Sequence, residues 1–167
     1  EEEEEFNDKF FYAWKNGRTG FPFLDACMRS LKFNGWINFR MRAMLMSFAS
    51  YHLWLHWKNT ADFLATLFID YEPGIHYTQS QMQSGTTGIN SIRIYNPIKQ
   101  GKDHDPEGLF IKKWLPELSN IPKKDIHTPW LSEVKLKNYP LPIVDESIAR
   151  KEACLLYTSP SPRDVRS

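Results

Sequence analysis

Apolar residues recur at helical spacing along the first third of the chain, and they predict two consecutive helices. Residues 22–34 begin with a proline, which suits the first turn of a helix, and they end before Gly35, which suits a helix stop. The next stretch, from about residue 38 to residue 57, is apolar on most of its sides. A helix that is hydrophobic all round is buried, so we expect this second helix at the centre of the domain.

The same pattern predicts two further helices in the middle of the chain. Thr60 is placed to cap a helix over residues 61–70, which ends before the Pro73-Gly74 pair. Another helix is expected from about His76 to Ser84, where Gly85 ends it. A loop rich in Gly, Asn and Asp is expected to follow.

The second half of the chain predicts only short helices. In "DPEGLFIKKWL", Asp105 is expected to cap a helix and Pro106 to take its first position. From Ser119 onward, prolines recur too often for long helices. They are Pro122, Pro129, Pro140 and Pro142. No stretch of any length alternates between apolar and polar residues, so the predicted fold class is all-α.

The two ends of the chain depart from the helical pattern. Residues 1–9 open with five glutamates, a like-charge run that predicts disorder, and no secretory signal is visible there. Residues 151–167 include "CLLYTSPSPRDVRS", which resembles the translation of a cloning or sequencing adaptor; a natural disordered tail is the alternative. The folded part is therefore expected to occupy residues 10–150.

Composition limits the functions to consider. The formal net charge is only +1, so any DNA binding has to come from a local patch. The aromatic fraction of 14% suits a domain that encloses a flat ligand, and it suits core filling equally well. Cys27 and Cys154 form neither a disulfide framework nor a metal pattern, which fits a reducing compartment such as the cytoplasm or nucleus. The longest apolar run, residues 43–57, is interrupted by serines and histidines and is not expected to span a membrane.

A turn near residue 105 carries acidic residues and a histidine, which together suggest a metal site. They are Asp103, His104, Asp105 and Glu107. A solvated turn that leads into a capped helix explains the same residues. We therefore predict no metal site.

Two arginines lie two positions apart in the apolar stretch "GWINFRMRAM". Residues so spaced on an α-helix point about 200° apart, so Arg40 and Arg42 do not share a face. Arg42 lies on an apolar stripe that is expected to point inward. Arg40 lies with Ser47 and Tyr51 on a more polar stripe, which is expected to face an opening.

A buried guanidinium needs a partner, because an unpaired buried charge is costly. The nearest plausible carboxylates to Arg42 are Asp70 and Glu72, in "FIDYEPG". Such a pair either ties two helices together or lies beside a ligand. The sequence pattern leaves both possibilities open.

Several longer motifs are more specific. The run "AWKNGRTGFPFLDACMRSLKFNGWINFRMR" is followed by "SFASYHLWLHW", "LFIDYEPGIH", "RIYNPIKQGKDHDPEGLFIKKWLPEL" and "IHTPW". These five blocks, in this order over about residues 10–130, resemble the FAD-binding helical domain of the photolyase/cryptochrome family. The resemblance implies an all-α fold that holds a folded FAD between helices. It also implies blue-light-driven electron transfer to a flipped-out pyrimidine dimer in DNA, or signalling without repair in cryptochromes.

The resemblance implies roles for individual positions in a cofactor pocket. Arg42 matches the arginine over the flavin ring, and Asp70 matches its aspartate partner. Phe39 replaces an asparagine that in photolyases reaches both flavin and lesion. The other implied pocket residues are Trp36, Glu72, which stands where the family usually has aspartate, and His76, which faces the flavin N5 edge where photolyases often carry asparagine.

The resemblance also implies DNA and electron-transfer positions. Arg40 matches an arginine that meets a DNA phosphate, and Arg93 is a second candidate for such a contact. Met82 replaces a cavity-wall tryptophan that would contact the lesion. Trp57 matches the middle tryptophan of the family's electron-transfer chain, whereas Ser80 replaces the tryptophan nearest the flavin.

The resemblance covers the later part of the family's helical domain. The family's N-terminal antenna domain, with its antenna chromophore, and the loop for the FAD phosphates have no counterpart in this sequence. We therefore expect a piece of a longer carbon–carbon lyase that acts on DNA with pyrimidine dimers, inactive by itself, with a cryptochrome-type photoreceptor as the alternative.

Overall fold

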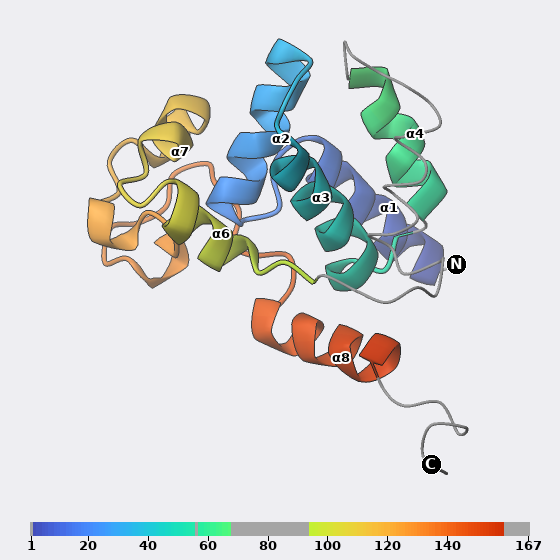
Figure 1. Ribbon diagram of the computed structural model, residues 1–167. Helices are drawn as coiled ribbons and strands as arrows, with labels where there is room; N and C mark the ends of the chain where they lie inside the picture. Colours follow the sequence, from blue (N-terminus) through green and yellow to red (C-terminus); the bar gives the residue numbers. More distant parts are fainter. Residues whose placement is uncertain (1, 56, 68–93, 159–167) are drawn as a thin grey trace.

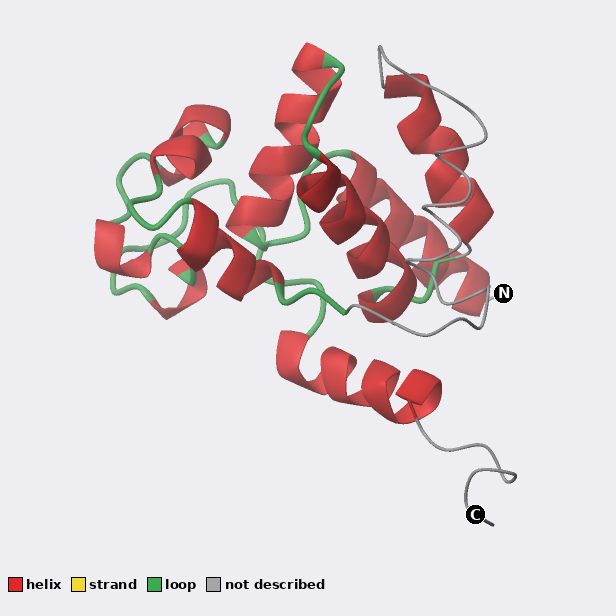
Figure 2. Cartoon of the chain, viewed as in Figure 1, coloured by secondary structure: helices red, strands yellow, loops and turns green. Residues whose placement is uncertain are grey.

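The computed structural model describes residues 2–55, 57–67 and 94–158, with the backbone alone at 2–6, 57–58 and 157–158. These residues form helices joined by loops, and no strand occurs among them (Figures 1 and 2). The predicted all-α class is confirmed. No helix in these ranges is both long and apolar enough to cross a bilayer.

Helix α2, Pro22–Asn34, has the bounds that the sequence predicts. It ends because Gly35 adopts a left-handed conformation, with φ of 72°, and donates its N–H to the Leu31 carbonyl at 2.7 Å. Nine of its residues are buried, so α2 runs through the core with α3, α6 and α7 packed around it. The figure shows it between α7 and α3 (Figure 1).

The predicted second helix is shorter than expected. Helix α3, Phe39–Ser47, is preceded by its N-cap Asn38, whose side chain accepts a hydrogen bond from the Met41 N–H at 2.9 Å. It continues into a single wide π-helical turn, η1, over Phe48–His52. Trp54 then takes a φ of 58°, which breaks the helix before residue 57.

Helix α4, Trp57–Leu67, therefore begins three residues before the predicted cap at Thr60. Thr60 is fully buried inside the helix instead of standing at its start. The predicted helix from His76 to Ser84 lies outside the described residues.

The acidic start of the chain is helical, not disordered as predicted. Helix α1 spans Glu2–Lys15, and its last turns anchor it to the core. Trp14 is fully buried and donates its indole N–H to the Leu45 carbonyl of α3 at 3.0 Å. Its ring meets Phe63 of α4 edge-to-face at 5.7 Å. One tryptophan thus joins three helices.

A helix also stands where a loop was predicted. Helix α6, Pro97–His104, starts at the Asn-Pro pair, where Asn96 accepts hydrogen bonds from the Ile98 and Lys99 N–H groups at 3.0 and 3.2 Å. Asn at the cap and Pro at the first position are strong start signals that outweigh the polar composition of this stretch.

Helix α7, Leu109–Trp114, begins later than predicted. Gly108, not Asp105, is the N-cap residue, although the two carboxylate oxygens of Asp105 accept from the Phe110 and Ile111 N–H groups at 3.1 and 2.9 Å. Pro106 lies in the turn before the helix, not at its first position. As predicted, the proline-rich stretch that follows forms only short 3-10 turns: η2 Pro116–Leu118, η3 Lys123–Asp125 and η4 Pro129–Leu131.

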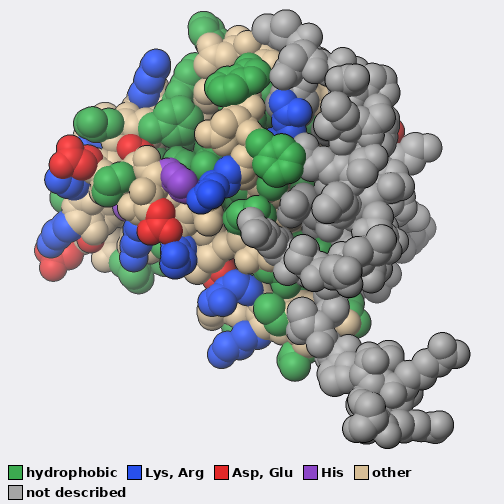
Figure 3. Space-filling model, in the orientation of Figure 1, with side chains coloured by type: hydrophobic (Ala, Val, Ile, Leu, Met, Phe, Trp, Pro, Cys, Tyr) green, Lys and Arg blue, Asp and Glu red, His purple; other side chains and the backbone are tan. Residues whose placement is uncertain are grey.

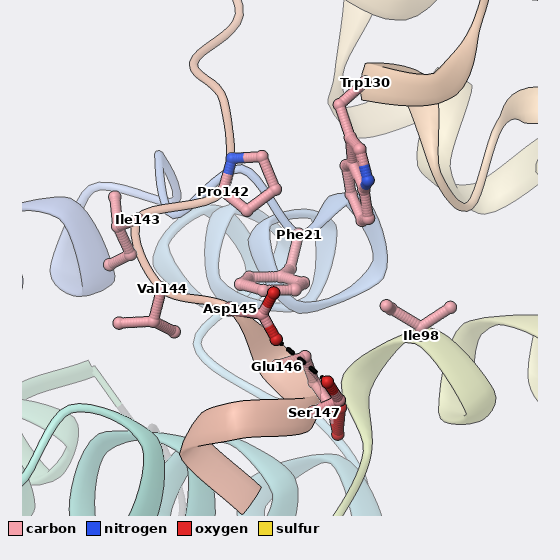
Figure 4. A pocket seen from close by; sticks show the side chains of 9 residues that line it. All are labelled: Phe21, Ile98, Trp130, Pro142, Ile143, Val144, Asp145, Glu146 and Ser147. Atoms are coloured by element: carbon pink, nitrogen blue, oxygen red, sulfur yellow. Dashed lines mark hydrogen bonds between the residues drawn. The ribbon is translucent and has the colours of Figure 1, made fainter.

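Helix α8, Glu146–Thr158, runs through residues 151–158, which were expected to be unstructured. It packs on η1, where Glu146 Oε1 lies 3.8 Å from the buried His52 Nε2. The segment before it crosses Phe21 and closes a hollow of about 520 Å³, with Trp130 on the far side (Figure 4). The adaptor origin of the tail stays a prediction.

Candidate functional site

A fully buried carboxylate holds the turn that leads into α2. Asp25 Oδ1 accepts from the Thr19 N–H at 2.9 Å and the Thr19 hydroxyl at 2.6 Å. Its Oδ2 accepts from the Gly20 N–H at 3.1 Å and the Tyr139 hydroxyl at 2.5 Å. Burial raises the pKa of Asp25 to about 6, although these hydrogen bonds pull it down. The Thr-Gly and Asp-Ala motifs therefore build scaffold.

Two more of the motifs meet in an ion pair. Arg29 of α2 donates two hydrogen bonds to Glu117 of η2, at 2.7 and 3.2 Å, and its Nε donates to the Gly17 carbonyl at 3.2 Å. Both charged side chains are less than one-fifth exposed. The Met-Arg and Pro-Glu-Leu motifs thus fix α2 against the end of α7. The pairing of Arg29 with Glu117 was not predicted from the sequence, where the presence of the two motifs is the only signal of it.

The two arginines of α3 differ in exposure. Arg40 is exposed and Arg42 is half-buried, as expected for neighbours two apart on a helix. The prediction that Ser47 and Tyr51 face an opening together with Arg40 is wrong, because both side chains are fully buried. The Tyr95 N–H donates to the Ser47 hydroxyl at 3.2 Å, so the segment that enters α6 covers this stripe.

Arg40 has a neighbour that the sequence did not reveal. Its Nη1 lies 3.4 Å from His104 Nε2, across 64 positions of sequence. The His104 ring stacks on Phe23 of α2, with centroids 6.4 Å apart and an interplanar angle of 18°. Arg40 and His104 therefore form one polar edge between α3 and the end of α6.

Two large aromatic side chains flank the start of α3 and are more than half exposed. Trp36 is 57% exposed and Phe39 is 65% exposed. Rings of this size usually bury most of their surface, although other aromatic side chains of the described part are exposed as well, such as Phe33 at 80%. Arg42, three positions after Phe39 on the same helix, is half-buried. Trp36, Phe39, Arg40 and Arg42 thus lie close together in the sequence at the start of α3, with the two arginines on different sides of the helix.

The remaining predicted site residues lie outside what the structure describes. Trp57 is the first residue of α4, but its side chain is not among the described ones. The other predicted positions are Asp70, Glu72, His76, Met82 and Arg93. Their roles stay predictions.

The polar turn near residue 105 uses its acidic side chains locally. Asp103 pairs with Lys99 at 3.1 Å, and Glu107 pairs with Lys123 at 2.8 Å, which lowers the pKa of Glu107. Asp105 accepts from two N–H groups at the start of α7. Across the described ranges, no group of three histidine, cysteine or acidic side chains is arranged to hold a metal ion.

Comparison with known proteins shows one consistent family. The model of the FAD binding domain of DNA photolyase matches residues 1–159. A deoxyribodipyrimidine photo-lyase of Alkalihalophilus pseudofirmus is 40% identical over 152 residues, which cover 84% of this chain and 32% of that protein. Cryptochrome-2 of Arabidopsis thaliana is also 40% identical over 152 residues, covering 84% of this chain and 25% of that protein.

A solved structure agrees with these matches. The archaeal photolyase of Sulfolobus tokodaii, crystallised with two FAD molecules, superimposes with a TM-score of 0.83 at 36% identity. The match covers 92% of this chain and 36% of that one. The chain therefore spans about a third of the length of the photolyases it matches.

Proposed function

This chain belongs to the photolyase/cryptochrome family, and on that premise we propose that it supplies flavin and DNA contacts of a light-driven DNA repair protein. The observation that carries the proposal is the contrast between the two arginines of α3. Arg42 is half-buried, whereas Arg40 is exposed at the polar edge with His104. Trp36 and Phe39, near the start of the same helix, are both exposed. The short helix α3 thus carries two arginines, of which Arg42 is proposed to contact the flavin ring and Arg40 an external anion.

The residues around Arg42 suit FAD, which when bound supplies the light-excited electron donor. Trp36 and Phe39 offer flat apolar faces that can hold a ring and exclude water. Arg42 provides a fixed positive charge in a partly desolvated place, where it stabilises negative charge on the ring more than it would in water. Asp70 is proposed as the carboxylate that pairs with Arg42. Glu72 and His76 complete the proposed pocket.

Arg40 is proposed to hold a phosphate of damaged DNA. An exposed guanidinium donates two parallel hydrogen bonds to a phosphate without a large desolvation cost. Such a contact gives affinity and orientation but no sequence preference, which suits a protein that seeks pyrimidine dimers. Arg93 is proposed as a second phosphate contact, Met82 as a wall of the lesion cavity, and Trp57 as a relay for electrons.

A second function is favoured by Phe39. Photolyases of this family carry at this position an asparagine that hydrogen-bonds to flavin and lesion, and a phenyl ring can do neither. Its 65% exposure leaves an apolar ring on the surface at the start of α3. This observation favours a cryptochrome-type photoreceptor, which signals through the same fold without repairing DNA.

A chimera tests the proposal. This chain would replace the matching 152 residues of the A. pseudofirmus photolyase, with the unaltered photolyase as control. We expect flavin absorbance in the purified chimera and light-dependent loss of pyrimidine dimers from ultraviolet-damaged DNA. Flavin without dimer loss would favour the photoreceptor, and a chimera that folds without flavin would contradict both functions.

A further inference from the structure

The hollow of about 520 Å³ beside the start of α8 is lined by none of the residues that are proposed to contact flavin or DNA. Four separate parts of the chain build its wall: Phe21 before α2, Ile98 of α6, Trp130 of η4 and residues 142–147. Its volume is within the range of roughly 300–1,000 Å³ that is typical of small-molecule sites. The hollow is therefore a candidate for a ligand of its own.

We propose that this hollow binds a small organic ammonium ion, in which an apolar ring or chain carries a protonated amine. The apolar wall is the first argument. The rings of Phe21 and Trp130 meet edge-to-face, with centroids 5.8 Å apart and an interplanar angle of 76°. Ile98 and Pro142 line the same space (Figure 4). An apolar body fills such a corner, and the face of an indole also attracts a cation.

The charge on the wall decides the sign of the ligand. Asp145 and Glu146 are the two ionisable side chains of the lining, and both are acidic. Glu146 accepts a hydrogen bond from Arg150 Nε at 2.9 Å, so its charge is balanced within α8. Asp145 Oδ1 accepts from the Ser147 hydroxyl and the Ile148 N–H, each at 3.0 Å. Both bonds end on Oδ1, which leaves Oδ2 of Asp145 for a cation.

Asp145 is charged and has no ion-pair partner in the described part of the chain. The hydrogen bond from the Ile148 N–H, above all, holds its pKa below the ordinary value, so the carboxylate is ionised at neutral pH. Acidic side chains elsewhere lie next to Lys or Arg, as Figure 3 shows on the viewed face and as Asp103 and Glu107 do. The start of α8 contributes about half a positive charge, which offsets only part of the charge of Asp145. The hollow therefore favours a cation.

The wall of the hollow is fixed to the core without a ligand. The Ile143 N–H donates to the Thr19 carbonyl at 2.9 Å. The chain passes so close to Gly20 that a Cβ atom there would lie 2.5 Å from the Leu141 carbonyl oxygen, and the φ of Gly20 is +88°. Binding therefore requires little ordering of the chain, which favours affinity for a small ligand.

Three benzyl compounds of similar size test the sign of the ligand. They are benzylamine, which is a cation at neutral pH, benzyl alcohol, which is neutral, and benzoate, which is an anion. Calorimetric titration of the whole chain gives their affinities. Nuclear magnetic resonance of the methyl groups of Ile98, Ile143 and Val144, which line the hollow, shows whether they bind there.

Two matched substitutions test the role of Asp145. Asp145→Asn removes the charge but keeps a residue that caps a helix equally well, so α8 should still form. Glu152→Gln makes the same kind of change at an exposed position of α8 that does not line the hollow. Circular dichroism confirms the helical folding of each variant.

We expect benzylamine to bind roughly fivefold or more tightly than benzyl alcohol, to shift the methyl resonances, and to bind more tightly than benzoate. Asp145→Asn should lose this preference for the amine, and Glu152→Gln should keep it. The proposal is overturned if benzylamine binds no more tightly than benzyl alcohol, if the methyl resonances do not move, if Asp145→Asn keeps the preference, or if Glu152→Gln loses it equally.

The comparison of the three compounds uses the unsubstituted chain, so it decides the proposal even if Asp145→Asn does not fold. The experiment measures neither flavin nor DNA. Its result is therefore independent of the proposed function.

Discussion

The Tyr139 hydroxyl donates a hydrogen bond of 2.5 Å to the Asp25 carboxylate, across 114 positions of sequence. Both groups are buried, and the contact fastens the C-terminal segment to the turn before α2. Burial raises the pKa of Tyr139 well above its ordinary value, and the nearby carboxylate raises it further. Tyr139 therefore stays a neutral donor, and Asp25 is the member of the pair that titrates in the accessible pH range.

The first prediction concerns the pH dependence of the free energy of unfolding. The native pKa of Asp25 is about 6, against 3.8 for an ordinary aspartate, so the native state holds this proton more tightly than the unfolded state does. Between about pH 4 and pH 6 the unfolded chain releases the proton first. The contribution of Asp25 to the free energy of unfolding is therefore fully present below pH 4 and declines as the pH rises through 6.

Urea unfolding of the chain and of Asp25→Asn at pH 4, 5, 6 and 7 measures this decline. As the pH rises, the free energy of unfolding of the unsubstituted chain should fall relative to that of Asp25→Asn. A difference that stays constant across this range, or that shifts in favour of the unsubstituted chain, would contradict the assignment.

The second prediction concerns the Arg29–Glu117 pair. Glu117→Gln leaves the poorly exposed Arg29 without its anion, which we expect to cost about 2 kcal/mol and to lower Tm by roughly 4–8 °C. Glu107→Gln is the matched control, because its partner Lys123 is on the surface and the change should leave Tm unaltered. Equal shifts in the two variants would argue against a structural role for Glu117.

The sequence predicts those helix ends whose start or stop signal lies within one turn of the end itself. Pro22 and Gly35 bracket α2 and predict its bounds, because both act on the backbone within one turn. The end of α3 was not predictable in this way. Neither the positive φ of Trp54 nor the wide turn over residues 48–52 has a glycine or proline signal in the local sequence. The wide turn packs against α8, which lies far along the chain.

The candidate site shows the same division. Helical spacing alone separates Arg40 from Arg42, and their exposures differ as expected. The contact between Arg40 and His104 was not predictable, since it depends on α6, which stands where the composition suggested a loop. The motif residues Asp25 and Arg29 proved to be scaffold, a distinction that needs the positions of their partners.

The third prediction concerns Gly101 in α6. A Cβ atom at this position would meet His127 Nδ1 and Phe23 Cβ, each at 2.8 Å. Replacing glycine by alanine inside a helix ordinarily stabilises it, but the overlap here should reverse the sign and cost about 1–3 kcal/mol. Thermal unfolding of Gly101→Ala checks this, with Lys102→Ala at the exposed neighbouring position as control. An increase in Tm for Gly101→Ala would show that α6 does not approach α2 this closely.

The fourth prediction concerns Phe39. In the chimera, Phe39→Asn restores an amide at the position where the family's photolyases carry one, and one added hydrogen bond of about 1 kcal/mol should raise the rate of dimer loss about fivefold. Phe33→Asn, also at an exposed phenylalanine, is the control and should change nothing. If Phe39→Asn leaves repair unchanged, Phe39 is not what limits repair.

The central claim is that Arg42 contacts the flavin and Arg40 contacts DNA, and one paired measurement tests it most directly. Arg40→Gln and Arg42→Gln would each be made in the chimera, and flavin per protein and affinity for damaged DNA would be measured for both. We predict that Arg42→Gln loses tenfold or more of its flavin. Arg40→Gln should keep its flavin but bind DNA more weakly, with a salt dependence reduced by about one phosphate contact. Equal flavin loss in both variants, or full flavin retention in Arg42→Gln, would contradict the account.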